Sequence, residues 1–105
     1  NIKLTSYDWE IQDIRGHEAE YDLDSTGFAA IHRPTALAYD DWSDEKKIAG
    51  AYYDEVKALL MERLGAHKVT IFDHTIRRGT PPGVEVEDTP ETRQPVPRVH
   101  VDQTP

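Results

Sequence analysis

The sequence predicts an α+β fold, and three observations carry that prediction. An apolar stripe of helical period occupies residues 43–64, and β-branched and aromatic residues crowd residues 69–76. Valines then alternate with other residues across 96–102. With 105 residues the chain is long enough for one modest core, so we treat residues 1–105 as a single domain.

Composition excludes several classes of function. The formal net charge is -8, from 20 acidic and 12 basic residues, and such a field repels a nucleic-acid backbone. Without cysteine the chain has no disulfide, thiolate nucleophile or thiolate metal site. No apolar run approaches the roughly 18 residues of a membrane span, so we expect no membrane partner and a cytoplasmic location. Because the first residue is Asn1 and not Met, we expect a piece of a longer product.

The first third of the chain, residues 2–34, is rich in strand-like and turn-forming residues. Within it, "AEYDLDSTGFAAIH" (19–32) has a Ser-Thr-Gly turn between two apolar segments, the pattern of a β-hairpin. Pro34 ends the segment.

The helix predicted over 43–64 has recognisable ends. Ser43 is a candidate N-cap, Asp44 and Glu45 place negative charge in the first turn, and Gly65 follows as a left-handed cap. Its stripe predicts packing against the sheet, with Trp42 and Tyr53 helping it to dock; the stripe residues are Ile48, Tyr52, Val56, Leu59, Leu60 and Leu64.

Two strands are predicted after the helix, at 69–76 and 96–102. Between them, residues 79–97 form a loop rich in proline and acidic residues, long enough to suggest function or mobility.

The last predicted strand carries the pattern His-x-Asp. Side chains alternate along a strand, so His100 and Asp102 project from one face, about 6.6 Å apart along the backbone. Imidazole nitrogen with carboxylate oxygen suits a first-row metal, as in the two-histidine, one-carboxylate facial triad. By itself the pattern is short, and a histidine–aspartate pair on a polar strand face is the alternative.

Four segments together resemble the AsaB-type hydroxylase/desaturase family, which is related to the CmcJ-like chain of cephem methoxylases. They are "DIRGHEAEYDLDSTGF" (13–28), "LLMERLGA" (59–66), "FDHTIRR" (72–78) and "RVHVDQT" (98–104). The resemblance implies the N-terminal portion of a double-stranded β-helix, or jelly roll, that uses Fe(II) and 2-oxoglutarate to hydroxylate or desaturate a small metabolite of secondary metabolism.

Carried over by position, His100 and Asp102 would be the first two iron ligands. The family's distal histidine and its 2-oxoglutarate-binding arginine would lie beyond residue 105, so we expect these residues alone to be catalytically inert. The relatives also suggest an accessory chain of a two-component methoxylase, and some are described as methyltransferases, although no glycine-rich cofactor loop supports that activity here.

Other residues are weaker candidates for contact with substrate or with the metal ligands. His74 could be a third ligand, but a structural histidine is the stronger interpretation. Arg77 and Arg78 alternate faces, so at most one can face a cavity and hold a carboxylate. Arg98 and Gln103 bracket the metal-ligand pair and could contact substrate.

Overall fold

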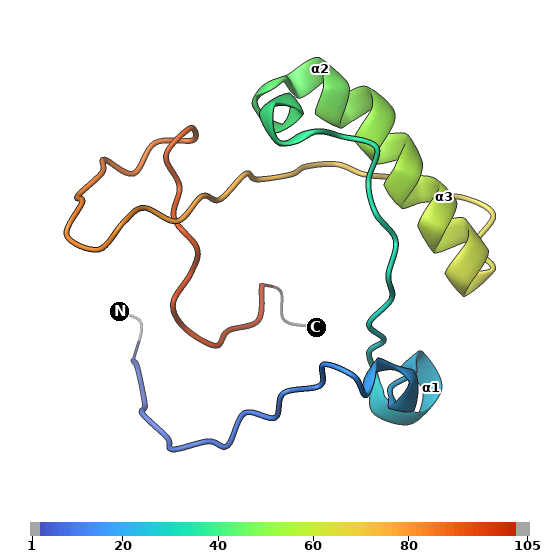
Figure 1. Ribbon diagram of the computed structural model, residues 1–105, viewed down its shortest axis with the longest axis horizontal. Helices are drawn as coiled ribbons and strands as arrows, with labels where there is room; N and C mark the ends of the chain where they lie inside the picture. The colour runs from blue at the N-terminus through green and yellow to red at the C-terminus, as the bar shows by residue number, and fades with distance from the viewer. Residues whose placement is uncertain (1–2, 103–105) are drawn as a thin grey trace. The chain divides into compact units, whose positions relative to one another are not determined.

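The computed structural model describes residues 3–102 and divides the chain into two compact units, Asn1–Pro34 and Thr35–Pro105. Figure 1 shows short helices and one long helix joined by irregular segments. Across residues 3–102 no strand forms. None of the helices in that range is long and apolar enough to cross a membrane.

In the first unit, the 3-10 helix η1 (Glu18–Glu20) precedes a single helical turn, α1 (Leu23–Thr26). The Asp22 carboxylate caps α1, accepting hydrogen bonds from the amides of Asp24 (2.9 Å) and Ser25 (2.8 Å). The Ser25 amide and hydroxyl hold the pKa of Asp22 below its ordinary value, because both bonds favour the carboxylate.

The hairpin predicted over 19–32 is therefore wrong. The Ser-Thr-Gly sequence ends a helical turn, with Gly27 at φ 78°, where a glycine carries no Cβ penalty. Asp22 forms local hydrogen bonds that compete with strand pairing. The apolar residues expected on the two strands instead meet locally, since the rings of Tyr21 and Phe28 stack 5.0 Å apart.

The second unit is built on the predicted helix, which is confirmed. It runs without a break through α2 (Glu45–Lys47), the π-helical turn η3 (Ile48–Tyr52) and α3 (Tyr53–Leu64), and a 3-10 helix, η2 (Tyr39–Ser43), precedes it. Gly65 ends the helix at φ 65°, as the sequence predicts.

The helix begins one residue later than predicted. Asp44, in extended backbone conformation, accepts hydrogen bonds from the amides of Lys46 (2.9 Å) and Lys47 (3.4 Å), so it is the N-cap in place of Ser43. Asp41 supports the same corner by an ion pair with Lys47 and by accepting the amide of Ala38 at 2.8 Å. These bonds lower the pKa of Asp41, the hydrogen bond from Lys47 having the largest effect.

The apolar stripe is covered in part, and its predicted packing against a sheet stays a prediction, because no strand forms across residues 3–102 and Leu64 is 56% exposed. Ile48 is 1% exposed and is the one fully buried residue among those described, while Tyr52, Val56 and Leu59 are half-buried. After Gly65 the chain reverses and returns alongside the helix (Figure 1).

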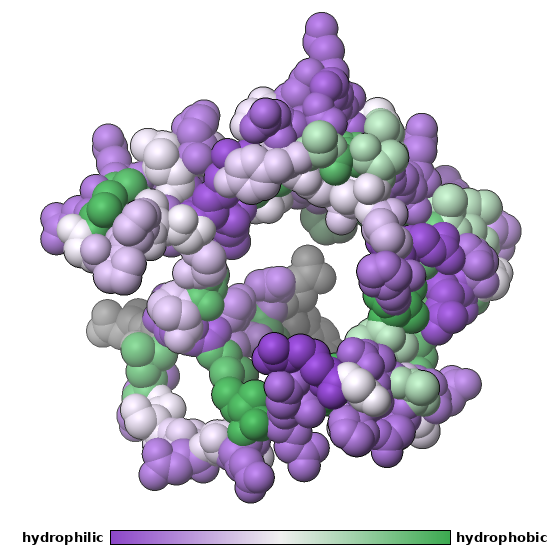
Figure 2. Space-filling view, viewed as in Figure 1, coloured by the Kyte–Doolittle hydropathy of each residue, from purple (hydrophilic) through white to green (hydrophobic). Residues whose placement is uncertain are grey.

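The segments predicted as strands, 69–76 and 96–102, are irregular in the structure. A strand needs a neighbour for its backbone groups, and across residues 3–102 neither segment finds one. Val99 and Val101, expected to pack behind the strand, are 106% and 78% exposed. Figure 2 shows such apolar side chains open at the surface among polar ones. The α+β class and the jelly roll stay predictions.

The Glu55 carboxylate, on α3, holds the first residues of the second unit against the helix. It accepts the Thr35 hydroxyl at 2.6 Å and the Ala36 amide at 2.9 Å, and these bonds lower the pKa of Glu55, the Thr35 hydroxyl having the larger effect.

Replacing Asp44 with alanine should destabilise the helix by about 1 kcal/mol, because two amides of its first turn lose their acceptor. Far-ultraviolet circular dichroism during thermal unfolding measures the loss. Ser43→Ala is the comparison variant and should cost less, because the Ser43 hydroxyl caps no amide of the helix and accepts only a hydrogen bond from Arg78. An equal loss in both variants would contradict the assignment of the cap to Asp44.

At pH values above the ordinary pKa of a glutamate, about 4.3, the hydrogen bonds of Glu55 should stabilise the folded unit in full. This stabilisation should be lost as the pH falls through the lowered pKa of Glu55 in the folded state. Carboxyl NMR titration should place the midpoint of Glu55 below that ordinary value. Thr35→Val should move the midpoint upward, and Thr70→Val should not move it. An unchanged midpoint in Thr35→Val would show that the hydroxyl is not the cause.

Candidate functional site

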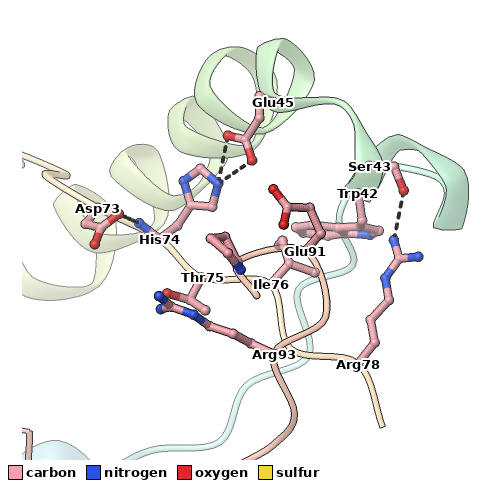
Figure 3. A pocket seen from close by; sticks show the side chains of 11 residues that line it. Trp42, Ser43, Glu45, Asp73, His74, Thr75, Ile76, Arg78, Glu91 and Arg93 are labelled. Carbon is pink, nitrogen blue, oxygen red and sulfur yellow. Dashed lines mark hydrogen bonds and ion pairs between the residues drawn. The ribbon is translucent and has the colours of Figure 1, made fainter. Parts of the chain in front are cut away.

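A cavity of about 430 Å³ opens in the second unit beside the start of the long helix. Three segments line it: the helix start, the segment 73–78 and the loop around 90–93 (Figure 3). Its lining mixes charged, hydroxyl and apolar side chains, namely Trp42, Ser43, Glu45, Asp73, His74, Thr75, Ile76, Arg78, Pro90, Glu91 and Arg93. A cavity of this size accommodates a small metabolite.

His74 joins the returning segment to the helix. Its Nδ1 lies 2.5 Å from the Tyr53 hydroxyl, and its Nε2 lies 3.0 Å from a Glu45 carboxylate oxygen. The Tyr53 and His74 rings meet edge to face at 5.5 Å. Both ring nitrogens therefore have protein partners, which fits the interpretation of His74 as a structural histidine. To ligate a metal, His74 would have to release Tyr53 or Glu45.

Two successive tyrosines at the end of the π-helical turn contact different neighbours. Successive residues of a helix point about 100° apart, so Tyr52 and Tyr53 face different parts of the unit. The Tyr52 ring packs edge-on against Trp42 at 4.6 Å, while Tyr53 faces the returning segment. Tyr53 thus docks the helix on the returning segment, while Trp42 packs on the helix itself.

Of the two adjacent arginines, Arg78 lines the cavity and Arg77 does not. An Arg78 guanidinium nitrogen donates to the Ser43 hydroxyl at 3.1 Å, and the guanidinium carbon lies 5.3 Å from the centre of the Tyr39 ring. Arg77 instead donates to the backbone carbonyl of Gln94 at 3.1 Å. Of the two candidates, Arg78 is the one at the cavity, while the role of Arg77 in substrate contact stays a prediction.

The loop predicted over 79–97 has internal order. The Gln94 side chain accepts the Thr80 amide at 3.1 Å and donates to the Thr92 carbonyl at 2.9 Å. The Arg78 amide donates to the Arg93 carbonyl at 3.1 Å, which brings the far end of the loop back to the segment 73–78. This closure carries Glu91 and Arg93 to the cavity.

His100 and Asp102 lie together, but they do not line this cavity. The His100 Nε2 lies 3.2 Å from Asp102 Oδ1, and His100 Nδ1 lies 2.8 Å from the Arg98 carbonyl. Both side chains face solvent, 48% and 92% exposed. Arg98 thus contributes its backbone carbonyl, while Gln103 lies outside the described residues.

The donor chemistry of this pair fits a divalent metal. The Arg98 carbonyl lies 2.8 Å from His100 Nδ1, and a backbone carbonyl at one ring nitrogen is a usual partner of a histidine that binds a metal through the other nitrogen. Two ligands about 2.1 Å from one metal and at right angles lie about 3.0 Å apart, close to the separation here. Within residues 3–102 no group of three or more histidine, aspartate or glutamate side chains could hold a metal ion together.

A comparison with protein families places the chain. A family model described as an oxidoreductase/YMDC permease-like domain matches residues 1–105, the full length of the sequence. The chain belongs to this family.

Three curated relatives are named as an oxidoreductase, a dioxygenase and a hydroxylase/desaturase. Oxidoreductase AN1597 of Emericella nidulans is 36% identical over 107 residues, covering 97% of this chain and 35% of the relative. Alpha-ketoglutarate-dependent dioxygenase tstK of Talaromyces stipitatus is 32% identical over 96 residues, covering 90% and 35%. Hydroxylase/desaturase efuI of Hormonema carpetanum is 31% identical over 105 residues, covering 90% and 34%.

This family member spans about a third of the length of the curated relatives it matches. No solved structure matches it.

The sequence does not predict several of the cavity residues. Glu45 is recognisable only as a charge in the first turn of the helix, and Glu91 and Arg93 only as members of a loop rich in proline and acidic residues. The distance from Glu45 to Tyr53, eight residues, suggests one helix face, and that was the available signal. No local pattern predicts that His74 lies between them.

Removing the Tyr53 hydroxyl should loosen the segment 73–78. In Tyr53→Phe the ring remains but one partner of His74 is lost, so trypsin should cleave after Arg77 and Arg78 about five-fold faster, the equivalent of one hydrogen bond. Tyr52→Phe, whose ring packs on Trp42, is the control and should cleave at the original rate. Equal acceleration in both variants would show that the Tyr53–His74 bond does not hold the segment.

Proposed function

We propose that the full-length protein containing this chain is an iron(II)- and 2-oxoglutarate-dependent oxygenase of the AsaB-type, CmcJ-like kind that hydroxylates or desaturates a small metabolite. The names of the relatives support this proposal, since one is an alpha-ketoglutarate-dependent dioxygenase and another is a hydroxylase/desaturase. The family description, an oxidoreductase-like domain, agrees with the same class of reaction.

The pair formed by His100 and Asp102 is the observation that carries the proposal. An imidazole nitrogen and a carboxylate oxygen, 3.2 Å apart, can approach one metal ion from two adjacent corners. In facial-triad enzymes the bound iron activates oxygen at its open positions. In this chain the Arg98 carbonyl orients the His100 ring, and Asp102 supplies negative charge that favours a cation beside it.

The proposal includes the fold. We propose that 69–76 and 96–102 become strands of a double-stranded β-helix when later parts of the full-length protein supply neighbours. Two observations support this: both segments have β-branched composition, and Val99 and Val101 alternate with the metal-ligand pair while lying fully open to solvent.

The accessory role remains the second candidate, because the described residues bring together only two potential ligands. An accessory chain would fold but would not turn over 2-oxoglutarate. Measuring metal binding and turnover on the same preparation separates the two functions.

In the full-length protein, His100→Ala and Asp102→Ala should each lower iron(II) affinity and succinate formation by at least about 100-fold, since losing a ligand costs more than losing its hydrogen-bond partner. Anaerobic iron titration followed by addition of oxygen and 2-oxoglutarate provides both measurements. His67→Ala, an exposed histidine outside the cavity and the pair, is the matched control. Unchanged affinity in both ligand variants would rule out the assignment.

The 105 residues alone should fail the same titration, because the pair lacks a third protein ligand among the described residues. Tight one-to-one iron binding that disappears in His100→Ala would contradict this expectation.

A further inference from the structure

We infer that residues 7–11 add a strand to a sheet of the full-length protein, with the Trp9 ring at the centre of the buried face. The partner of this strand is the part of that protein that lies outside this chain. The inference does not depend on the proposed reaction. It shares with the proposed fold only the expectation that other parts of the full-length protein form a sheet.

Residues 7–11 alternate between apolar and acidic side chains. Tyr7, Trp9 and Ile11 occupy every second position, and Asp8 and Glu10 lie between them. Successive side chains of an extended backbone point to opposite faces, so the apolar side chains share one face and the acidic side chains the other. Tyrosine, tryptophan and isoleucine are residues that strands favour. The pattern is typical of a strand with one face against a core and one face in water.

The described part of the chain leaves this apolar face uncovered. The exposed fractions are 74% for Tyr7, 82% for Trp9 and 93% for Ile11. Residues 3–13 form neither helix nor strand (Figure 1). Within the described chain no backbone group of residues 7–11 forms a hydrogen bond with another backbone group. A segment with this composition and with unpaired N–H and C=O groups is a template for pairing with another strand.

The length of the relatives indicates where the partner lies. This chain spans 35%, 35% and 34% of three curated relatives, so about two thirds of a protein of that length lies outside it. That larger part has room for a sheet and a core, whereas the described residues bury only Ile48 fully.

A second copy of the chain fits this segment less well. In an antiparallel pair centred on Trp9, Asp8 of one copy would lie opposite Glu10 of the other. Like charges directly opposite each other destabilise a pair of strands. The net charge of -8 on each chain adds repulsion between copies. Charge therefore favours a partner strand within the same full-length protein.

Amide hydrogen exchange of the full-length protein without iron, followed residue by residue by NMR, tests the inference. At least every second amide of residues 7–11 should exchange about 100-fold or more slowly than in an unstructured chain, because pairing with one neighbouring strand engages alternate amides. Trp9→Ser should accelerate exchange in this segment at least about ten-fold, since a buried ring is lost. Glu10→Ser, the same replacement on the opposite face, is the matched control and should keep the protection.

Three results would overturn the inference: unprotected amides in the full-length protein, equal protection in the 105 residues alone, or protection that disappears on dilution. The second result would place the partner within this chain, and the third would place it in a second copy. Equal acceleration in Trp9→Ser and Glu10→Ser would also contradict it, because the Trp9 ring would then not lie on the buried face. Circular dichroism checks the folding of each variant, and the unsubstituted protein decides the inference even if Trp9→Ser unfolds. A protein that protects these amides but binds no iron would refute the proposed reaction alone.

Discussion

The second unit depends on the contacts of one half-buried histidine. His74 lies between Tyr53 and Glu45, two residues on the long helix, and its ring nitrogens contact both. These two contacts of His74 hold the segment after Gly65 against the helix. Arg78 follows four residues later, so its contact with Ser43 extends the same attachment to the helix start. The cavity exists because the returning segment is fixed at these two points.

Such attachment matters more here than in a protein with a large core. Ile48 is the one fully buried residue of the described range, and hydrophobic burial is normally the dominant stabilising term. Exposed ion pairs, such as that between Asp41 and Lys47, contribute little each. Specific polar contacts therefore define the geometry of the unit, while the apolar stripe of α3 remains only partly covered.

Periodicity predicted what depends on neighbours along the chain. The helix follows from apolar spacing and from Gly65, and His100 and Asp102 meet because they are two residues apart. The hairpin prediction is wrong because Asp22 caps a helical turn, α1, which the turn-forming residues alone do not indicate. The cavity was not predictable, since it depends on contacts such as Ser43 with Arg78, 35 residues apart. The two predicted strands stay predictions, because a strand needs a neighbouring strand to pair with and residues 3–102 contain none.

The π-helical turn Ile48–Tyr52 takes up one residue more than an ordinary turn, and this number of residues fixes how the helix start is oriented relative to α3. A regular α-helix advances about 100° per residue, so inserting one further residue as ordinary helix between Glu45 and Tyr53 would rotate the helix start relative to α3 by about that angle. Glu45 and Tyr53 could then no longer both contact His74, and Trp42 would no longer pack against the Tyr52 ring. Relatives that share the cavity should therefore conserve the number of residues between Trp42 and Tyr53 more strictly than their identity, and insertions should fall in the loop 79–97 instead.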